Sequence, residues 1–154
     1  MEVKATLRVI NEAAFPGRRG VTDGQTYQRL IGWPEVQQTD RVRVGRATYA
    51  PGTYEQLHWH PIEACYYVIA GHATVRNIEG EEFEVSAGSM IYAPAGIAGA
   101  HEWEVDESLE LLDIRATNET ERKIQFTVDK ATKRSYIDLE DLAYRDAISF
   151  KSHY

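Results

Sequence analysis

The 154-residue sequence contains a single cysteine, Cys65, so no disulfide can form within the chain. Disulfides are typical of secreted proteins, and their absence gives no reason to expect export. The first ten residues alternate between charged and apolar side chains without a continuous apolar segment, and they do not resemble a signal peptide. We therefore expect a cytoplasmic protein.

The sequence also lacks the long apolar and basic runs that membranes and nucleic acids require. No stretch approaches the ~20 consecutive apolar residues that cross a bilayer. The net charge is −7, and the basic residues form no long run. Because nucleic acids and anionic membranes bind basic surfaces, we expect neither of them as a partner.

A series of short β-prone segments, separated by Gly and Pro, fills most of the chain instead. The length suits one domain with a proper core, and such short strands are typical of an all-β sandwich or barrel. A short C-terminal helix is expected within 135–150, with Asp138 as a cap at its start. The expected strands are residues 6–10, 26–33, 41–50, 53–60, 64–71, 73–78, 81–85, 89–93, 101–105, 109–117 and 124–128.

His58 and His60 lie one residue apart in an expected strand. Side chains at such positions share one face of a strand, so both imidazoles can reach the same ion. Imidazole suits Fe, Zn, Cu, Mn and Ni. The alternative is a buried histidine bonded to the backbone beside a solvated one. Because Gly52 precedes the pair and Pro61 follows it, we favour the metal site.

Residues 52–71, GTYEQLHWHPIEACYYVIAG, resemble the first motif of the cupin superfamily: Gly, five residues, His-x-His, a Glu after three or four more, six residues and Gly. Residues 88–101, GSMIYAPAGIAGAH, resemble its second motif, with Gly, five residues, Pro-x-Gly and a final His. The resemblance covers about residues 41–116. It implies an antiparallel jelly-roll β-barrel in which His58, His60 and His101 converge on a divalent metal ion.

The resemblance also gives an organisation for the whole chain. Residues 1–154 are expected to form one cupin domain, with an N-terminal strand arm (1–33) and a C-terminal extension (118–154). Many small cupins pair through sheet edges and an exchanged N-terminal strand, so a homodimer is expected.

Two departures from the cupin motifs matter. The motif glutamate should stand seven residues before Gly71, where this chain has Ala64. Its neighbours Glu63 and Cys65 are alternative ligands, although a one-residue offset turns a side chain to the opposite face of a regular strand. The second departure is that His101 follows Gly96 by five residues rather than three. An insertion of two residues keeps the same face.

Three neutral histidines leave a divalent ion with its full charge, which attracts a small chelating anion. Such a centre resembles cupin dioxygenases that cleave diketones or hydroxyketones with Fe(II). We therefore predict an Fe(II) dioxygenase with an apolar barrel lining. Zn, Mn or Ni would suit an isomerase, lyase or cyclase, and the loss of the glutamate is also compatible with a non-catalytic small-molecule-binding cupin.

Two further residues are candidates for catalysis. Tyr66 shares the face of position 64, so it is expected to point inward and either orient the substrate or donate a proton. The alternative for Tyr66 is a core aromatic residue with a satisfied hydroxyl group. Glu63 is the second candidate, as the carboxylate displaced from position 64.

Overall fold

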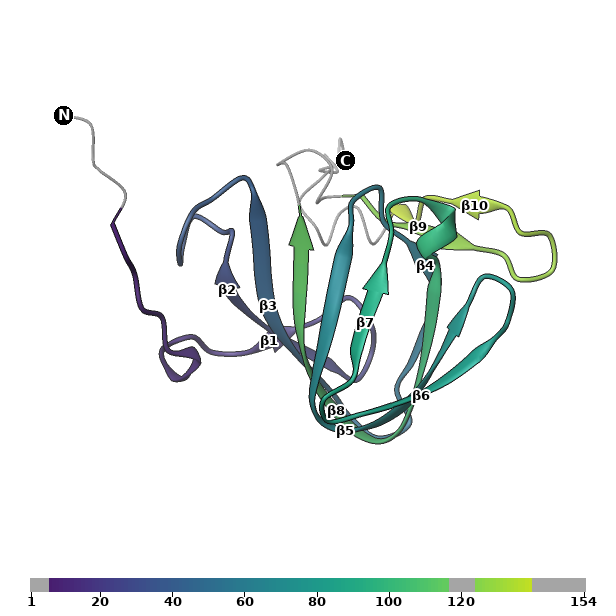
Figure 1. Cartoon of the computed structure of the whole chain (residues 1–154), viewed down its shortest axis with the longest axis horizontal. Helices are drawn as coiled ribbons and strands as arrows, with labels where there is room; N and C mark the ends of the chain where they lie inside the picture. The colour runs from purple at the N-terminus through teal and green to yellow at the C-terminus, as the bar shows by residue number, and fades with distance from the viewer. Residues whose placement is uncertain (1–5, 117–123, 140–154) are drawn as a thin grey trace, which may run out of the picture.

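The computed structural model describes residues 6–116 and 124–139, which form antiparallel strands curved around a buried interior (Figure 1). This agrees with the expected all-β architecture. The strands are β1 (Arg18–Arg19), β2 (Gln25–Ile31), β3 (Val42–Tyr49), β4 (Tyr54–Trp59), β5 (Ala64–Asn77), β6 (Glu82–Ser86), β7 (Met90–Ala93), β8 (His101–Ala116), β9 (Phe126–Val128) and β10 (Ser135–Tyr136), with 3₁₀ turns η1 (Glu12–Ala14) and η2 (Ile97–Gly99).

The longest strand, β8, organises the fold because it pairs with β3, β4 and β5. The main path of the sheet runs β1-β2-β3-β8-β4-β9-β10, and β5 carries β6 and β7 beside it. The expected strands 64–71 and 73–78 are one continuous strand, β5, and the expected strands 101–105 and 109–117 are likewise one strand, β8. Register shifts between Val68 and Ala70 and between Gly71 and Ala73 let β5 bend while it stays paired with β8.

The interior is built from alternate residues of these strands. In the second half of β8 the buried side chains are Leu109, Leu111, Asp113 and Arg115. Because successive side chains of a strand point to opposite faces, this period of two directs all four to the same side of β8. Trp103 is among the largest fully buried side chains. The same alternation that buries the apolar core therefore also carries an acidic and a basic residue inward.

One expectation for the ends of the chain is wrong. Residues 6–10 form no strand, and Leu7 and Val9 are each 90% exposed. Alternating side chains alone do not make a strand, because a strand also needs a partner edge for its backbone hydrogen bonds. The segment expected to contain a C-terminal helix begins with β10, which pairs with β9, and Leu139, directly after the expected cap Asp138, is helical. Its continuation from residue 140 lies outside the described residues.

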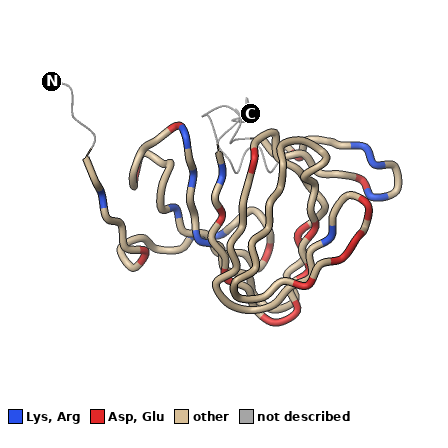
Figure 2. The backbone as a smooth tube through the Cα atoms, in the orientation of Figure 1, with Lys and Arg blue, Asp and Glu red and all other residues tan. Residues whose placement is uncertain are grey.

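Acidic residues gather along the hairpin of β5 and β6 (Figure 2). Glu82 and Glu104 each lie 2.8 Å from a guanidinium nitrogen of Arg76.

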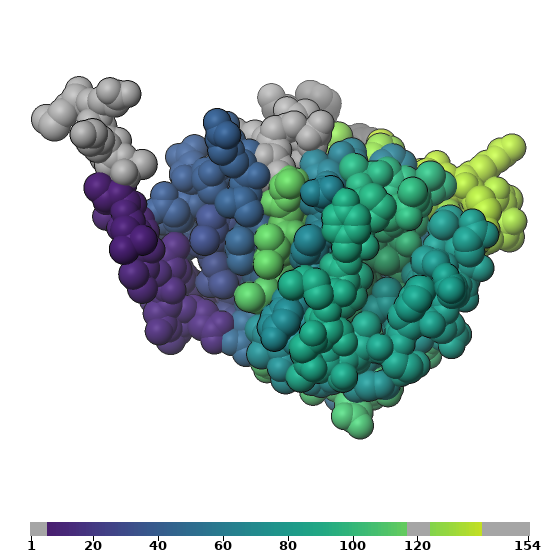
Figure 3. Space-filling model, viewed as in Figure 1, coloured from purple at the N-terminus to yellow at the C-terminus, as the bar shows by residue number. Residues whose placement is uncertain are grey.

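The space-filling view shows the segment from β5 to β7 covering one face of the barrel (Figure 3). Large apolar side chains are exposed on these strands, among them Ile69, Met90 and Tyr92. Within the described residues, no helix has the length and apolar character needed to cross a membrane.

Candidate metal centre

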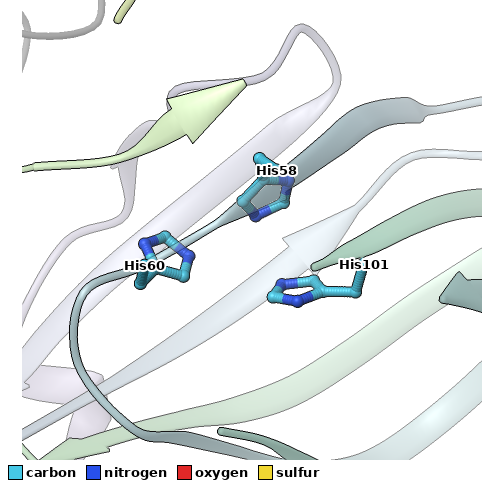
Figure 4. A group of neighbouring side chains, drawn as sticks. All are labelled: His58, His60 and His101. Carbon is cyan, nitrogen blue, oxygen red and sulfur yellow. The ribbon is translucent and has the colours of Figure 1, made fainter. Parts of the chain in front are cut away.

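The structure brings His58, His60 and His101 together (Figure 4). His58 lies in β4 and is the register partner of His101, the first residue of β8, while His60 directly follows β4. One ligand nitrogen from each side chain can be chosen so that all three lie within 4.8 Å of one another. All three residues are buried. Three imidazoles at this separation can surround a single ion.

The backbone fixes the orientation of two of these rings. Nδ1 of His58 lies 2.6 Å from the carbonyl oxygen of Gln56, and Nδ1 of His101 lies 2.8 Å from that of Gly99. A carbonyl oxygen only accepts hydrogen bonds, so each Nδ1 carries a proton, and in the neutral ring Nε2 then presents its electron pair. Metal-binding histidines commonly donate their second N–H in this way. Both side chains therefore fit a divalent metal ion.

His101 is held in the neutral form that a metal ligand requires. Burial, and after it the neighbouring His58, lower the pKa of His101 from 6.5 to about 3. A charged imidazolium at this position would have to give up its hydration and approach a second imidazole. The residue is thus uncharged across the physiological pH range.

This low pKa predicts that the metal-free protein loses stability in mild acid. Between pH 6.5 and about 3 the unfolded chain binds a proton at His101 and the folded chain does not, so acid favours unfolding. The expected contribution is about 1.4 kcal/mol per pH unit. Urea unfolding at pH 7 and pH 5 measures it, and a His101→Asn variant should show a flatter dependence. An equal slope in both proteins would contradict the assignment.

His60 has a different partner, the guanidinium group of Arg115. Nη1 of Arg115 lies 3.3 Å from Nδ1 of His60. Arginine only donates, so this Nδ1 accepts the hydrogen bond. Ligation through Nε2 would move the proton to Nδ1 and require Arg115 to shift, whereas ligation through Nδ1 would use the electron pair that Arg115 now faces. In either case the position of Arg115 is coupled to metal binding.

Arg115 belongs to a buried ionic group. Its Nε donates to Asp113 at 2.8 Å, and the Tyr27 hydroxyl donates to the same carboxylate at 3.3 Å. Burial by itself would raise the pKa of Asp113. Attraction to Arg115 and Arg43, together with the two hydrogen bonds, outweighs burial and lowers that pKa. Both partners are therefore ionised beside the histidines.

Tyr66 lies inside the barrel, as its position in the sequence predicts, and is only 5% exposed. Its hydroxyl oxygen is 3.2 Å from Nε2 of His101. Because Nδ1 of His101 carries the proton, the tyrosine hydroxyl is the donor in this contact. Burial raises the pKa of Tyr66 far above its ordinary value, so the hydroxyl keeps its proton. A protonated oxygen thus stands at the edge of the histidine cluster.

Glu63 is not brought to the histidines. Its side chain is exposed, and one carboxylate oxygen accepts a hydrogen bond of 2.5 Å from the Tyr92 hydroxyl. Ala64 is buried and pairs in regular register with Ala93, so the residues on either side of it are turned outward. Cys65, the other alternative ligand, is only half-buried.

Glu55 is a carboxylate at the site that sequence reasoning missed. Its Oε1 lies 3.4 Å from Nε2 of His58, and its side chain is 13% exposed. Strict alternation along β4 places residue 55 on the face opposite to both histidines. A register shift between Glu55 and His58 in the pairing with β8 cancels that rule. No pattern in the sequence signals this shift.

The expected apolar lining is wrong for the part of the interior next to the histidines. Each histidine has a polar side chain within 3.4 Å: Glu55 at His58, Arg115 at His60 and Tyr66 at His101. Asp113 and Arg115 could have been suspected, since they continue the spacing of two from the buried Leu109 and Leu111. The site therefore offers proton-bearing and charged groups in addition to its metal ligands.

Residues 45–115 match the family model of the cupin domain. This segment is a cupin domain. Among solved structures, the polyketide cyclase RemF from Streptomyces resistomycificus is similar over 74% of this chain and 86% of its own, at 19% identity and a TM-score of 0.62. KdgF from Halomonas sp. is similar over 73% of this chain and 96% of its own, at 19% identity and a TM-score of 0.61.

The DMSP lyase DddQ from Ruegeria pomeroyi DSS-3 is also similar to this chain, at 20% identity and a TM-score of 0.59. The match covers 68% of this chain and 57% of that protein. No curated protein sequence matches the chain. At these identities the solved structures establish the fold alone, so the chemistry has to be argued from the side chains of the site.

Proposed function

We propose that the cupin is a metal-dependent enzyme acting on a small anionic substrate by polarisation and proton transfer, as an isomerase, lyase or cyclase does. The observation that carries this proposal is the Tyr66 hydroxyl, a buried proton donor 3.2 Å from a histidine of the cluster. A divalent ion at the cluster would act as a Lewis acid toward a bound oxygen atom. The cyclase and lyase activities of RemF and DddQ, both similar in fold, support the same class.

The cupin's own residues divide the remaining work. His58, His60 and His101 would hold the ion. A metal ion on Nε2 of His101 would take the electron pair that the Tyr66 hydroxyl now faces, which would leave this hydroxyl, with its proton, available to a substrate atom next to His101. Arg115, beside His60, attracts the negative charge of the substrate. Because these side chains are buried, few water molecules compete with them, and their electrostatic effect is strong.

An Fe(II) dioxygenase remains the second candidate. It is favoured by the ligand group itself, which contains three histidines and no carboxylate among the described residues. The polar interior gives less support to this candidate than the apolar lining expected from the sequence would have given. Iron as the metal, a cytoplasmic location and a homodimer also stay predictions. The exposed apolar side chains on β5 and β7, such as Ile69 and Met90, support the homodimer.

The test begins with protein purified without a metal-affinity tag or a chelator. Bound metal is counted by mass spectrometry, and the protein is then reconstituted separately with Fe(II), Zn²⁺, Mn²⁺ or Ni²⁺. Small hydroxyketones, diketones and hydroxy acids are followed by NMR with and without dioxygen. Metal-dependent turnover under anaerobic conditions supports the proposal. Turnover that requires both Fe(II) and dioxygen supports the second candidate, and loaded protein without turnover on any substrate contradicts both.

Tyr66→Phe is expected to lower kcat by about 10²- to 10⁴-fold, because it removes the proposed proton donor. The metal content should not change, since the ring and its packing are kept. Tyr67→Phe is the matched control: Tyr67 is the next residue of β5 and is 39% exposed on the outer face. Equal kcat values for the two variants would rule out a catalytic role for Tyr66.

A further inference from the structure

We propose that Glu55 is a fourth protein ligand of the metal ion and replaces the carboxylate that position 64 lacks. The inference rests on the proposed metal centre and goes beyond its three histidines. Glu55 lies outside the cupin motif glutamate position, nine residues before Ala64. It reaches the same centre from β4 rather than from the start of β5.

The first support is the relation between Glu55 and His58. Nδ1 of His58 donates to the backbone of Gln56, so in the neutral ring that a metal ligand requires, Nε2 presents an electron pair. Oε1 of Glu55 lies 3.4 Å from that nitrogen and presents electron pairs of its own. Two ligand atoms that are each ~2.1 Å from one ion, at a tetrahedral angle, are about 3.4 Å apart. The observed separation therefore fits two atoms that share a metal ion.

The second support is the way in which the backbone turns Glu55 inward. Glu55 pairs with Trp103 and His58 pairs with His101, so three steps along β4 match only two steps along β8. The additional residue is a β-bulge, and bulges re-aim side chains next to active sites. In a regular strand, residues three positions apart point to opposite faces. Here the bulge brings the carboxylate to the histidine side.

The third support is the arrangement of the two carboxylate oxygens. The Tyr49 hydroxyl lies 3.3 Å from Oε2, while Oε1 is the atom on the His58 side. A buried carboxylate is costly unless hydrogen bonds or a cation compensate its charge. A divalent ion at the histidines would add its positive charge to these contacts at Oε1. The group that lies within 4.8 Å contains the histidines alone, so Glu55 would have to move toward His60 and His101 to join them on one ion.

A carboxylate ligand also changes what the centre binds. Three neutral histidines leave a divalent ion with a net charge of +2, and one carboxylate lowers it to +1. The centre then attracts a singly charged chelating anion without holding it so tightly that the product is slow to leave.

The test uses the metal-free full-length protein with Zn²⁺ and Co²⁺ as probes. The dissociation constant for Zn²⁺ is measured by competition with a chromophoric chelator, and the visible absorption of Co²⁺ reports the ligand set. Changes to residues that only support metal ligands cost about 10- to 100-fold in affinity. Removal of a ligand by Glu55→Gln is expected to weaken Zn²⁺ binding at least ~100-fold and to change the Co²⁺ spectrum. Glu63→Gln removes an exposed carboxylate outside the histidine group and should leave both unchanged.

Glu55→Asp keeps the charge but shortens the side chain, and it covers the case in which the glutamine variant does not fold. An affinity between wild type and Glu55→Gln, with a shifted Co²⁺ spectrum, supports the inference. Wild-type affinity and spectrum in the folded glutamine variant would overturn it and leave Glu55 as an ion-pair partner of His58. A wild-type protein that binds neither metal would overturn the metal centre itself, which is a different result.

Discussion

Replacement of His58 by alanine is expected to abolish stoichiometric metal binding. His58 is the histidine that links the cluster, since its ring centroid lies 5.1 Å from that of His60 and 4.4 Å from that of His101. A metal site in a protein typically needs at least three side-chain ligands. Without His58 only two of the three histidines remain, and the site is expected to hold an ion at least ~1,000-fold more weakly, a loss of about 4 kcal/mol of binding free energy. Turnover should be lost together with the metal.

The matched control for this prediction is His72→Ala. His72 is only partly exposed, belongs to β5 and lies within 2.9 Å of both Asp106 and Glu84, outside the cluster. Metal content by mass spectrometry, with thermal unfolding of both metal-free variants, separates loss of a ligand from loss of the fold. About one ion per chain in folded His58→Ala would mean that the three histidines are not the metal site.

The histidine cluster could be predicted because its geometry depends on the alternation of side chains along a single strand. His58 and His60 occupy alternate positions, and Pro61 ends the strand directly after them. The two additional residues before His101 left its face unchanged, and the structure pairs it with His58. The burial of Tyr66 follows from the same rule, since it continues the face of the buried Ala64. Local alternation was sufficient in each of these cases.

Glu55 could not be predicted because its orientation depends on a non-local pairing. The bulge exists only in the register of β4 against β8, where partners lie more than 40 residues apart along the chain. The lengths of β5 and β8 could not be predicted for the same reason. Gly71 and the residues near Ser108 look like breaks in the sequence, but the two strands bend together there and stay paired.

The polar interior is also a consequence of tertiary structure. A sequence pattern classes Asp113 and Arg115 as polar, and polar residues in a strand are usually assigned to its solvent face. Here they occupy the buried face because they neutralise each other, and Tyr27 contributes a further hydrogen bond. Partners brought together from β2 and β8 make this burial tolerable. The same pair places a positive charge at His60, so the feature that stabilises the interior also shapes the site.

Replacement of Gly71 by alanine is expected to prevent stable folding. Gly71 has a φ of +92°, and a Cβ built on it would lie 1.7 Å from the carbonyl oxygen of Ser108. That contact is with backbone rather than with a flexible side chain, so β5 and β8 would have to separate at their shared bend. We expect a loss of more than about 4 kcal/mol in the free energy of unfolding, a size that is rare for a single substitution.

Gly88→Ala isolates the steric part of this effect. Gly88 has the same φ of +92°, but a Cβ on it would meet nothing within 4 Å. Its expected cost is therefore only the ~1–2 kcal/mol of a left-handed backbone with a side chain. Urea unfolding of both variants measures the difference. Similar losses in the two variants would show that β5 and β8 can move apart at Gly71. The close contact between these strands would then not explain why a glycine stands at this position.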